Sequence, residues 1–129
     1  MHSGTILRVV RPTDDLAPLR RFYVDALRFP IFHSFEDHEG FDGLIVGVPG
    51  ADYHFAFTRK HGFSAGRAAT AENLLVFYLE DRAEWEAAVA RMRAHGFDPM
   101  EPHNPYWRAN GVTFEDADGY RVVLKNSAP

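Results

Sequence analysis

His54 is the residue of this 129-residue chain whose position most directly indicates chemistry. It lies in the apolar run 52–58, between Tyr53 and Phe55. Because successive side chains of a strand point to opposite faces, His54 faces away from these two aromatic residues and into a cavity. There its imidazole could act as a general base or hold a ligand oxygen. The alternative is a strand histidine that bonds a neighbouring backbone group.

Two arginines are candidates for the positive charge of a ligand site. Arg8, on the first expected strand, would bind a carboxylate or phosphate well, or could instead pair with Glu80. Arg121 is expected on the cavity side of the last strand, although its position near a hairpin favours a solvated side chain. Tyr78 and Glu80 are expected to face the same cavity. An isolated buried carboxylate is costly, so Glu80 should pair with Arg8 or Arg121, or lie near the rim.

The aromatic pair Tyr106 and Trp107 follows Asn104 and Pro105 in an expected loop. It could cover an apolar ligand by stacking, pack against a partner subunit or plug the end of a barrel. A role in a pocket or interface is favoured over a role in the core.

Two groups of residues have a superficial likeness to a metal site. The charge run 36–39 carries three carboxylates and a histidine, but such a run at a strand-to-strand turn is typical of solvated surface. His33, His38 and His54 could form a different site, although their spacing matches no known ligand pattern. The chain has no cysteine, which excludes thiol catalysis, disulfides and Cys-ligated zinc.

The composition indicates a globular protein of one domain, 1–129, with 46% hydrophobic residues. A net charge of -4 argues against a nucleic-acid partner or an anionic membrane surface. No apolar stretch approaches the roughly 20 residues that span a bilayer, and the N-terminus lacks the apolar core of a signal peptide. A cytoplasmic location is therefore expected.

The elements that would position these residues repeat once along the chain. The first half predicts a strand at 5–12, a helix capped by Thr13 and Asp14, and strands at 31–37, 42–48 and 52–58. A polar linker, 59–72, follows. The second half predicts a strand at 73–80, a helix between the cap Asp81 and Gly96, and strands at 97–100, 111–116 and 119–126. Each half is a βαβββ module, about 5–58 and about 73–126, and the fold class is α+β.

This doubled unit resembles the vicinal oxygen chelate superfamily, which includes glyoxalase I, extradiol dioxygenases and bleomycin-resistance proteins. The resemblance rests on three segments: Arg-Pro-Thr-Asp-Asp-Leu (11–16) leading to Phe22-Tyr23, Leu-Val-Phe-Tyr-Leu-Glu-Asp (75–81) and Asp-Ala-Asp-Gly-Tyr-Arg-Val-Val-Leu (116–124). Segments 38–43, 53–58 and 104–107 further resemble a subgroup typified by the bacillar protein YycE. The resemblance implies a pseudo-twofold pair of modules that forms a curled mixed-sheet half-barrel around a central cavity.

Metal-dependent members of the superfamily take His, Gln or Glu ligands from four strands. Counting from the Phe-Tyr and Asp-Gly segments places Arg8, Ala56, Leu74 and Val123 at those positions. An alkyl side chain has no lone pair and a guanidinium accepts nothing, so no metal and no cofactor are expected.

The resemblance therefore implies a protein like the bleomycin-resistance branch, which binds a small anionic or aromatic ligand without a metal. Its cavity would be lined by six residues: Arg8, His54, Tyr78, Tyr106, Trp107 and Arg121. The alternative is an enzyme, a lyase, isomerase or dioxygenase of the glyoxalase type, with His54 or Glu80 as base. We also expect a homodimer through strand edges or the helix faces that carry Phe22 and Trp85.

Overall fold

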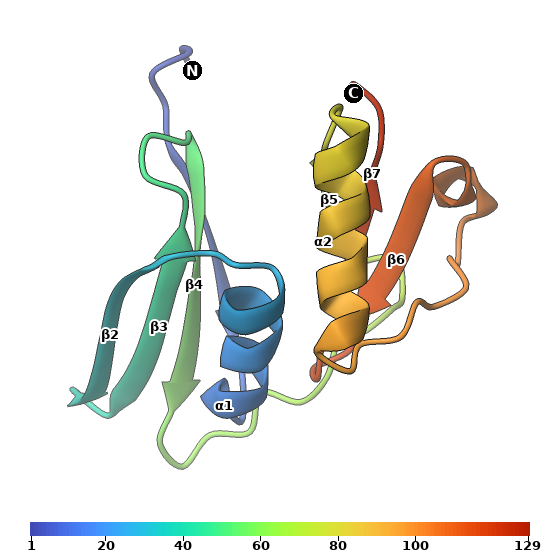
Figure 1. Cartoon of the computed structure of the whole chain (residues 1–129). Helices are drawn as coiled ribbons and strands as arrows, with labels where there is room; N and C mark the ends of the chain where they lie inside the picture. Colours follow the sequence, from blue (N-terminus) through green and yellow to red (C-terminus); the bar gives the residue numbers. More distant parts are fainter. The chain divides into compact units, whose positions relative to one another are not determined.

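The chain forms two compact units in a computed structural model that describes all 129 residues. The first unit is Met1–Gly66 and the second is Arg67–Pro129. Their boundary falls inside the polar segment 59–72 that separates the two expected modules. The units are described separately below, and Figure 1 shows the elements of each.

The first unit contains one helix and four strands. The strands are β1 (Leu7–Pro12), β2 (Ile31–His38), β3 (Phe41–Gly47) and β4 (Tyr53–Lys60), in the sheet order β1-β4-β3-β2. β1 runs parallel to β4, and the other pairs are antiparallel. All four strands lie within a few residues of the segments that the sequence predicts.

The helix of the first unit begins one residue later than expected. α1 (Leu16–Leu19) is capped by Asp15, whose side chain accepts from the backbone N–H of Ala17. It continues as a π-helical segment, Arg20–Ala26, in which the N–H of Leu27 reaches back five residues to the carbonyl of Phe22. Asp14, which the sequence suggests as a cap, instead accepts from the backbone of Ala65 and Gly66. It thus fixes the end of the unit.

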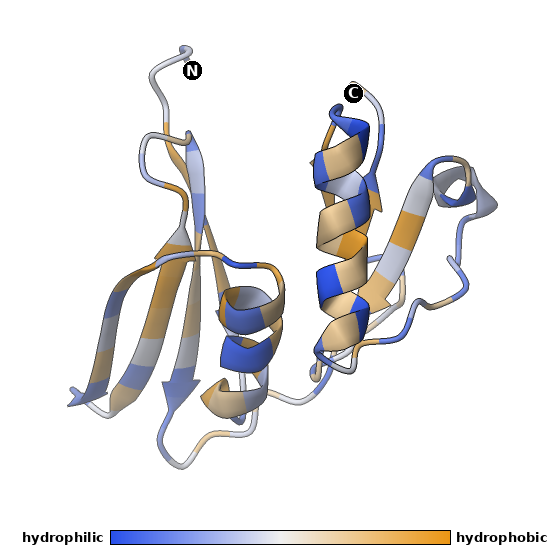
Figure 2. Cartoon of the chain, viewed as in Figure 1, coloured by the Kyte–Doolittle hydropathy of each residue, from blue (hydrophilic) through white to orange (hydrophobic).

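Aromatic side chains fill the core between this helix and the sheet. Tyr23 packs on Phe57 with ring centroids 4.6 Å apart, and Phe29 packs on Phe55 at 5.6 Å. Figure 2 colours much of β3 as hydrophobic and the far ends of β2 and β4 as hydrophilic. Because side chains alternate along a strand, His54 lies on the face opposite the helix. We call this face of each sheet its helix-free face.

The second unit contains one long helix and three strands. They are β5 (Leu74–Tyr78), α2 (Arg82–Ala94), β6 (Gly111–Glu115) and β7 (Arg121–Lys125), with the sheet order β5-β7-β6. As in the first unit, the first and last strands are parallel and the remaining pair is antiparallel. A short 3-10 helix, Pro105–Arg108, precedes β6.

The prediction of a strand at 97–100 is wrong, since only a single bridge between Met100 and Thr113 forms there. The cause lies in the sequence that follows Phe97. Pro99, Pro102 and Pro105 have no N–H to donate to a ladder, so a regular strand cannot extend through this segment. It forms a loop instead.

The helix ends of the second unit are those that the sequence predicts. Asp81 caps α2 by accepting from the N–H of Glu84, and Gly96 follows the helix in the left-handed conformation, with φ +88°. Ala88 and Met92 are buried, and the indole N–H of Trp85 donates to the carbonyl of Leu124 at 2.9 Å. This bond attaches the helix to β7.

The α+β class is confirmed. The mixed strands form two sheets, one in each unit. The pseudo-twofold relation of the modules and the cavity around it stay predictions. No helix of the chain combines the length and apolar character that a membrane span requires.

Candidate functional site

Arg8 and His54 meet on the helix-free face of the first sheet. They are direct neighbours in the parallel pairing of β1 with β4, and the Nε of Arg8 donates to the Nε2 of His54 at 2.7 Å. The ring of Phe32 lies 6.0 Å from that of His54. The two residues that the sequence proposes separately therefore form one polar pair.

This bond sets what the pair can do. A guanidinium only donates, so the Nε2 of His54 is the acceptor and its proton must lie on Nδ1. The lone pair that a general base needs is then already used. His54 thus bonds a side chain rather than a backbone group. Arg8 is exposed and keeps further N–H donors for a ligand oxygen.

A pocket of about 180 Å³ lies on the helix-free face of the second sheet. Its sheet side is formed by cross-strand neighbours, since Leu74 pairs with Arg121 and Thr113 with Val123. We call it the second-unit pocket, and its lining is Ala71, Glu72, Leu74, Pro102, His103, Asn104, Trp107, Thr113, Arg121 and Val123. Trp107 and Arg121, both predicted from the sequence, come together here.

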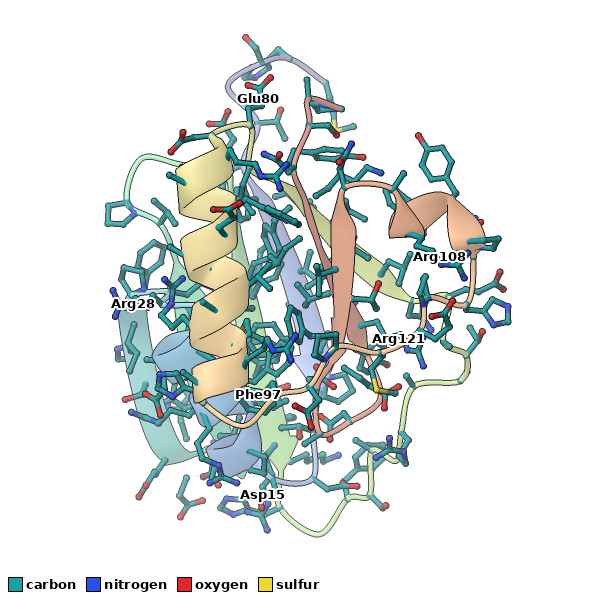
Figure 3. The ribbon with its side chains drawn as sticks, turned by 45° about the vertical axis from the view of Figure 1, so that its right-hand side comes forward. Asp15, Arg28, Glu80, Phe97, Arg108 and Arg121 are labelled. Atoms are coloured by element: carbon teal, nitrogen blue, oxygen red, sulfur yellow. The ribbon has the colours of Figure 1, made fainter.

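Arg121 is held firmly inside this pocket. Its side chain is only 12% exposed, its Nε lies 3.2 Å from a carboxylate oxygen of Glu115, and one terminal nitrogen donates to the carbonyl of Glu101 at 3.1 Å. The expectation of a solvated side chain is therefore wrong. In Figure 3 Arg121 lies beside the sheet, near the loop that carries Arg108. The guanidinium has more N–H donors than these two bonds use.

Thr113 adds an unsatisfied hydroxyl to the same pocket. The residue is 3% exposed, and its Oγ1 is buried without a hydrogen-bond partner. Buried polar atoms are nearly always bonded, and an exception needs an explanation. Thr113 lines the pocket while its Oγ1 is covered in the ligand-free chain, so a ligand atom would reach this hydroxyl after the side chain rotates.

The turn that carries Trp107 is fixed from three sides. Asn104 caps it by accepting from the N–H of Tyr106 at 3.0 Å. Lys125 donates to the carbonyl of Ala109, and its Nζ lies 5.9 Å from the centroid of Trp107. Gly111 packs so closely that a Cβ there would overlap the carbonyl oxygen of Trp107. Trp107 is therefore a rigid wall of the pocket.

The other expected residues lie outside this pocket. Tyr106 is 68% exposed and packs edge-on against Trp107. Tyr78 is the cross-strand neighbour of Lys125 and is 39% exposed. Glu80 does not face the pocket, because β5 ends at Tyr78, and Figure 3 shows Glu80 and Arg121 toward opposite ends of the unit. The expected pairing of Glu80 with Arg121 is wrong, because Arg121 pairs with Glu115. The expected pairing of Glu80 with Arg8 stays a prediction, since the two residues belong to separate units.

Sequence reasoning missed Glu115, Thr113 and Glu72. The signal for the first two was present. The hairpin turn 116–119 fixes the register of the strands around it, so Glu115 must lie opposite Arg121 and Thr113 opposite Val123. Nothing in the sequence indicates Glu72, which lies in the segment before β5 and whose carboxylate is 3.7 Å from the imidazole of His103.

The metal ligands of the superfamily do not fit this chain. Arg8 donates to His54, while Ala56, Leu74 and Val123 carry alkyl groups. None of these side chains offers a lone pair to a cation. Nor does any group of three or more His, Asp or Glu side chains in the chain come close enough to hold a metal ion, whether at 36–39 or around His33 and His38.

A further polar cluster joins the ends of β2, β3 and β4 in the first unit. Asp42 accepts from the backbone of Asp37 at 2.9 Å, from His61 at 2.8 Å and from Arg59 at 3.2 Å. The backbone bond first, and then His61, hold the pKa of the Asp42 carboxyl below its ordinary value. This cluster fixes the strand ends.

Comparison with known proteins places both halves in one family. Residues 7–58 match the YycE-like N-terminal domain, and residues 72–126 match the YycE-like C-terminal domain. The uncharacterized protein YycE of Bacillus subtilis is 40% identical over 121 residues, which are 94% of this chain and 87% of that protein.

Solved structures agree with this match. The crystal structure of a YycE protein of unknown function from Bacillus subtilis has a TM-score of 0.89 and 38% identity, covering 98% of this chain and 92% of its own. Glyoxalase I of Leishmania major shares the fold with a TM-score of 0.71 at 20% identity, covering 94% and 85%. The fosfomycin resistance protein FosX of Mesorhizobium loti does so at 0.68 and 16%, covering 99% and 94%. The chain thus belongs to the YycE-like family of the vicinal oxygen chelate superfamily.

Proposed function

We propose that this chain binds a small anionic or aromatic ligand without the metal centre of its superfamily. One observation carries the proposal: Arg121, Thr113 and Trp107 line a single pocket, and the buried hydroxyl of Thr113 has no hydrogen-bond partner. Ligand sites typically combine an apolar wall with a few directed polar groups. The Arg8–His54 pair is a separate polar group on the first unit, and Arg8 is exposed there.

Two observations favour binding over the enzyme alternative. A general base must have a free lone pair within reach of the proton that it removes, and the Nε2 of His54 already accepts from Arg8. Glu80, the other proposed base, is exposed and lies beyond the end of β5. A lyase, isomerase or dioxygenase would need a different base from those that the sequence suggests.

The site can be found by screening. Thermal-shift measurements with carboxylates, phenols and antibiotics should identify ligands that stabilise the protein. The chain has two tryptophans, so Trp85→Phe leaves Trp107 as the only indole reporter. A ligand in the second-unit pocket should change the emission of Trp107 in this variant. A confirmed ligand that leaves this emission unchanged would contradict the assignment of the pocket.

Metal independence has its own measurement. Protein purified without chelators should contain no stoichiometric divalent ion, and ligand affinity should not change when EDTA is added. The reason is that Arg8, Ala56, Leu74 and Val123 supply no metal-binding atom. Elemental analysis near one zinc, nickel, iron or manganese per chain would overturn this part of the proposal.

We also propose a homodimer, through fewer of the surfaces that the sequence suggests. Phe22 is fully buried in the first unit, so the helix face that carries it is not available for a partner. Strand edges and the face of α2 near Trp85 are left, and exposed edges tend to be covered. Light scattering should give twice the chain mass, and a monomer at micromolar concentrations would exclude this assembly.

A further inference from the structure

We infer that the second-unit pocket selects an uncharged, planar ring that carries a hydrogen-bonding oxygen, in preference to an aromatic carboxylate. Aromatic amides, phenols and aromatic ketones belong to this class. The inference rests on the proposed function and narrows the ligand class that it leaves open.

The balance of charge around the pocket carries the inference. Arg121 is paired with Glu115 at 3.2 Å, so its positive charge is already compensated inside the protein. Glu72 lines the pocket with a second negative charge. Lys125, whose Nζ lies 5.9 Å from the ring of Trp107, adds a second positive one. His103 beside Glu72 is charged only when protonated. Two positive and two negative groups leave no net charge for an anion to neutralise.

A carboxylate would therefore gain little in this pocket. It would give up its hydration, compete with Glu115 for the same guanidinium and approach the carboxylate of Glu72. Removing an ion from water costs several kcal/mol unless a charge of opposite sign is free to compensate it. An uncharged oxygen avoids most of this cost.

The unused hydrogen-bonding atoms fit an uncharged ligand. Arg121 retains N–H donors beyond its bonds to Glu115 and Glu101. The hydroxyl of Thr113 can both donate and accept, and nothing bonds it. A carbonyl or phenolic oxygen would accept from Arg121 and, once the side chain of Thr113 rotates, would bond its hydroxyl. The ring would then pack against Trp107 and the alkyl groups of Leu74 and Val123.

The volume of the pocket is sufficient for one ring. A cavity of about 150 Å³ admits benzene, and this one measures about 180 Å³. A single ring with one small substituent fills such a space.

Three probes of nearly the same shape test the inference: benzamide, which is neutral, benzoate, which is negative, and benzylammonium, which is positive. Each is titrated into the Trp85→Phe variant at neutral pH and followed by the emission of Trp107. We expect benzamide to bind about tenfold more tightly than either ion, which corresponds to about 1.4 kcal/mol. Benzoate binding as tightly as benzamide, or more tightly, would overturn the inference.

Glu115→Gln tests the cause of this selectivity. It removes the charge that compensates Arg121, so the preference for benzamide over benzoate should fall by about tenfold. An unchanged ratio in a folded variant, checked by circular dichroism, would show that the ion pair does not set the selectivity. The comparison of the three probes on the unmodified pocket does not depend on this variant.

Thr113→Val tests where the oxygen of the ligand binds. It should lower the affinity for benzamide about threefold to tenfold, since one hydrogen bond to the ligand is lost. Thr58→Val, in the first unit, is the matched control and should leave the affinity unchanged. An equal affinity for Thr113→Val and its control would overturn the placement. If none of the three probes binds up to its solubility limit, the proposed function of this pocket fails, and the inference with it.

Discussion

The two sheets have the same plan but differ in what lies over their helix-free faces. In each, the first and last strands are parallel and a hairpin completes the order. In the first unit β2 continues the sheet as a fourth strand, and Arg8 remains exposed. In the second unit the corresponding segment leaves the sheet after Met100, and Trp107 and Arg121 line a pocket.

Proline content explains this difference. The segment that forms β2 contains no proline between Ile31 and His38, so none of its residues lacks the N–H that pairing with β3 requires. In the second unit three prolines between Phe97 and Tyr106 prevent a ladder, and the chain turns back through a 3-10 helix. A strand exchanged for a loop thus gives the second sheet a pocket with Trp107 in its lining.

The largest expected effect comes from Gly111→Ala. The new Cβ would overlap the carbonyl oxygen of Trp107, which is backbone and cannot rotate away, so about 3 kcal/mol of unfolding free energy should be lost. Gly43→Ala in the first unit would overlap the ring of Phe35, a side chain that can move, and should cost about 1 kcal/mol. Urea unfolding measures both. Equal costs would show that the turn over the second sheet is not rigid.

Trp107→Ala should have the second largest effect, on ligand affinity. It removes the wall of the pocket, and a stacked ring should bind at least about tenfold more weakly. Arg8→Ala should leave this affinity nearly unchanged, because Arg8 does not line the second-unit pocket. Calorimetric titration of both variants with one screened ligand gives the order. A larger loss for Arg8→Ala would place the main site on the first unit.

Thr113→Val should raise the free energy of unfolding by about 1 kcal/mol and lower the affinity for the ligand. Valine keeps the shape of threonine and removes a buried hydroxyl that has no partner in the protein. Thr58→Val, at a half-buried position in the first unit, should change stability little. Thermal unfolding of the two variants provides the comparison. A destabilised Thr113→Val would mean that the hydroxyl is bonded in the ligand-free protein.

The smallest effect concerns acid unfolding of the first unit. The pKa of Asp42 is lower in the folded chain than its ordinary value of 3.8, so the carboxylate stabilises the fold above that pH. This contribution disappears as the pH falls through the folded pKa. Asp42→Asn should therefore lower the urea midpoint at neutral pH, and the difference from the unmodified chain should shrink below pH 3.8. A difference that is constant with pH would exclude this linkage.

The sequence by itself determined the α+β class, the family and most of the elements. Repeated apolar runs, helical spacing and cap residues such as Asp81 and Gly96 are local signals, because each depends on neighbours a few residues away. The residue types at Arg8, Ala56, Leu74 and Val123 also predict that the superfamily's metal ligands are missing, and this stays a prediction. The loop expected around Trp107 is instead a short 3-10 helix, Pro105–Arg108, which Asn104 caps.

Only the tertiary structure decided which side chains meet. Arg8 bonds His54 across 46 residues of sequence, and Arg121 pairs with Glu115 instead of Glu80. Strand register settles both outcomes, and register depends on how distant segments align. The strand expected at 97–100 is missing because prolines there lack N–H donors. A missing donor matters only where a partner strand would accept from it. Pairing between distant segments is a property of the folded sheet, so the pocket emerges only there.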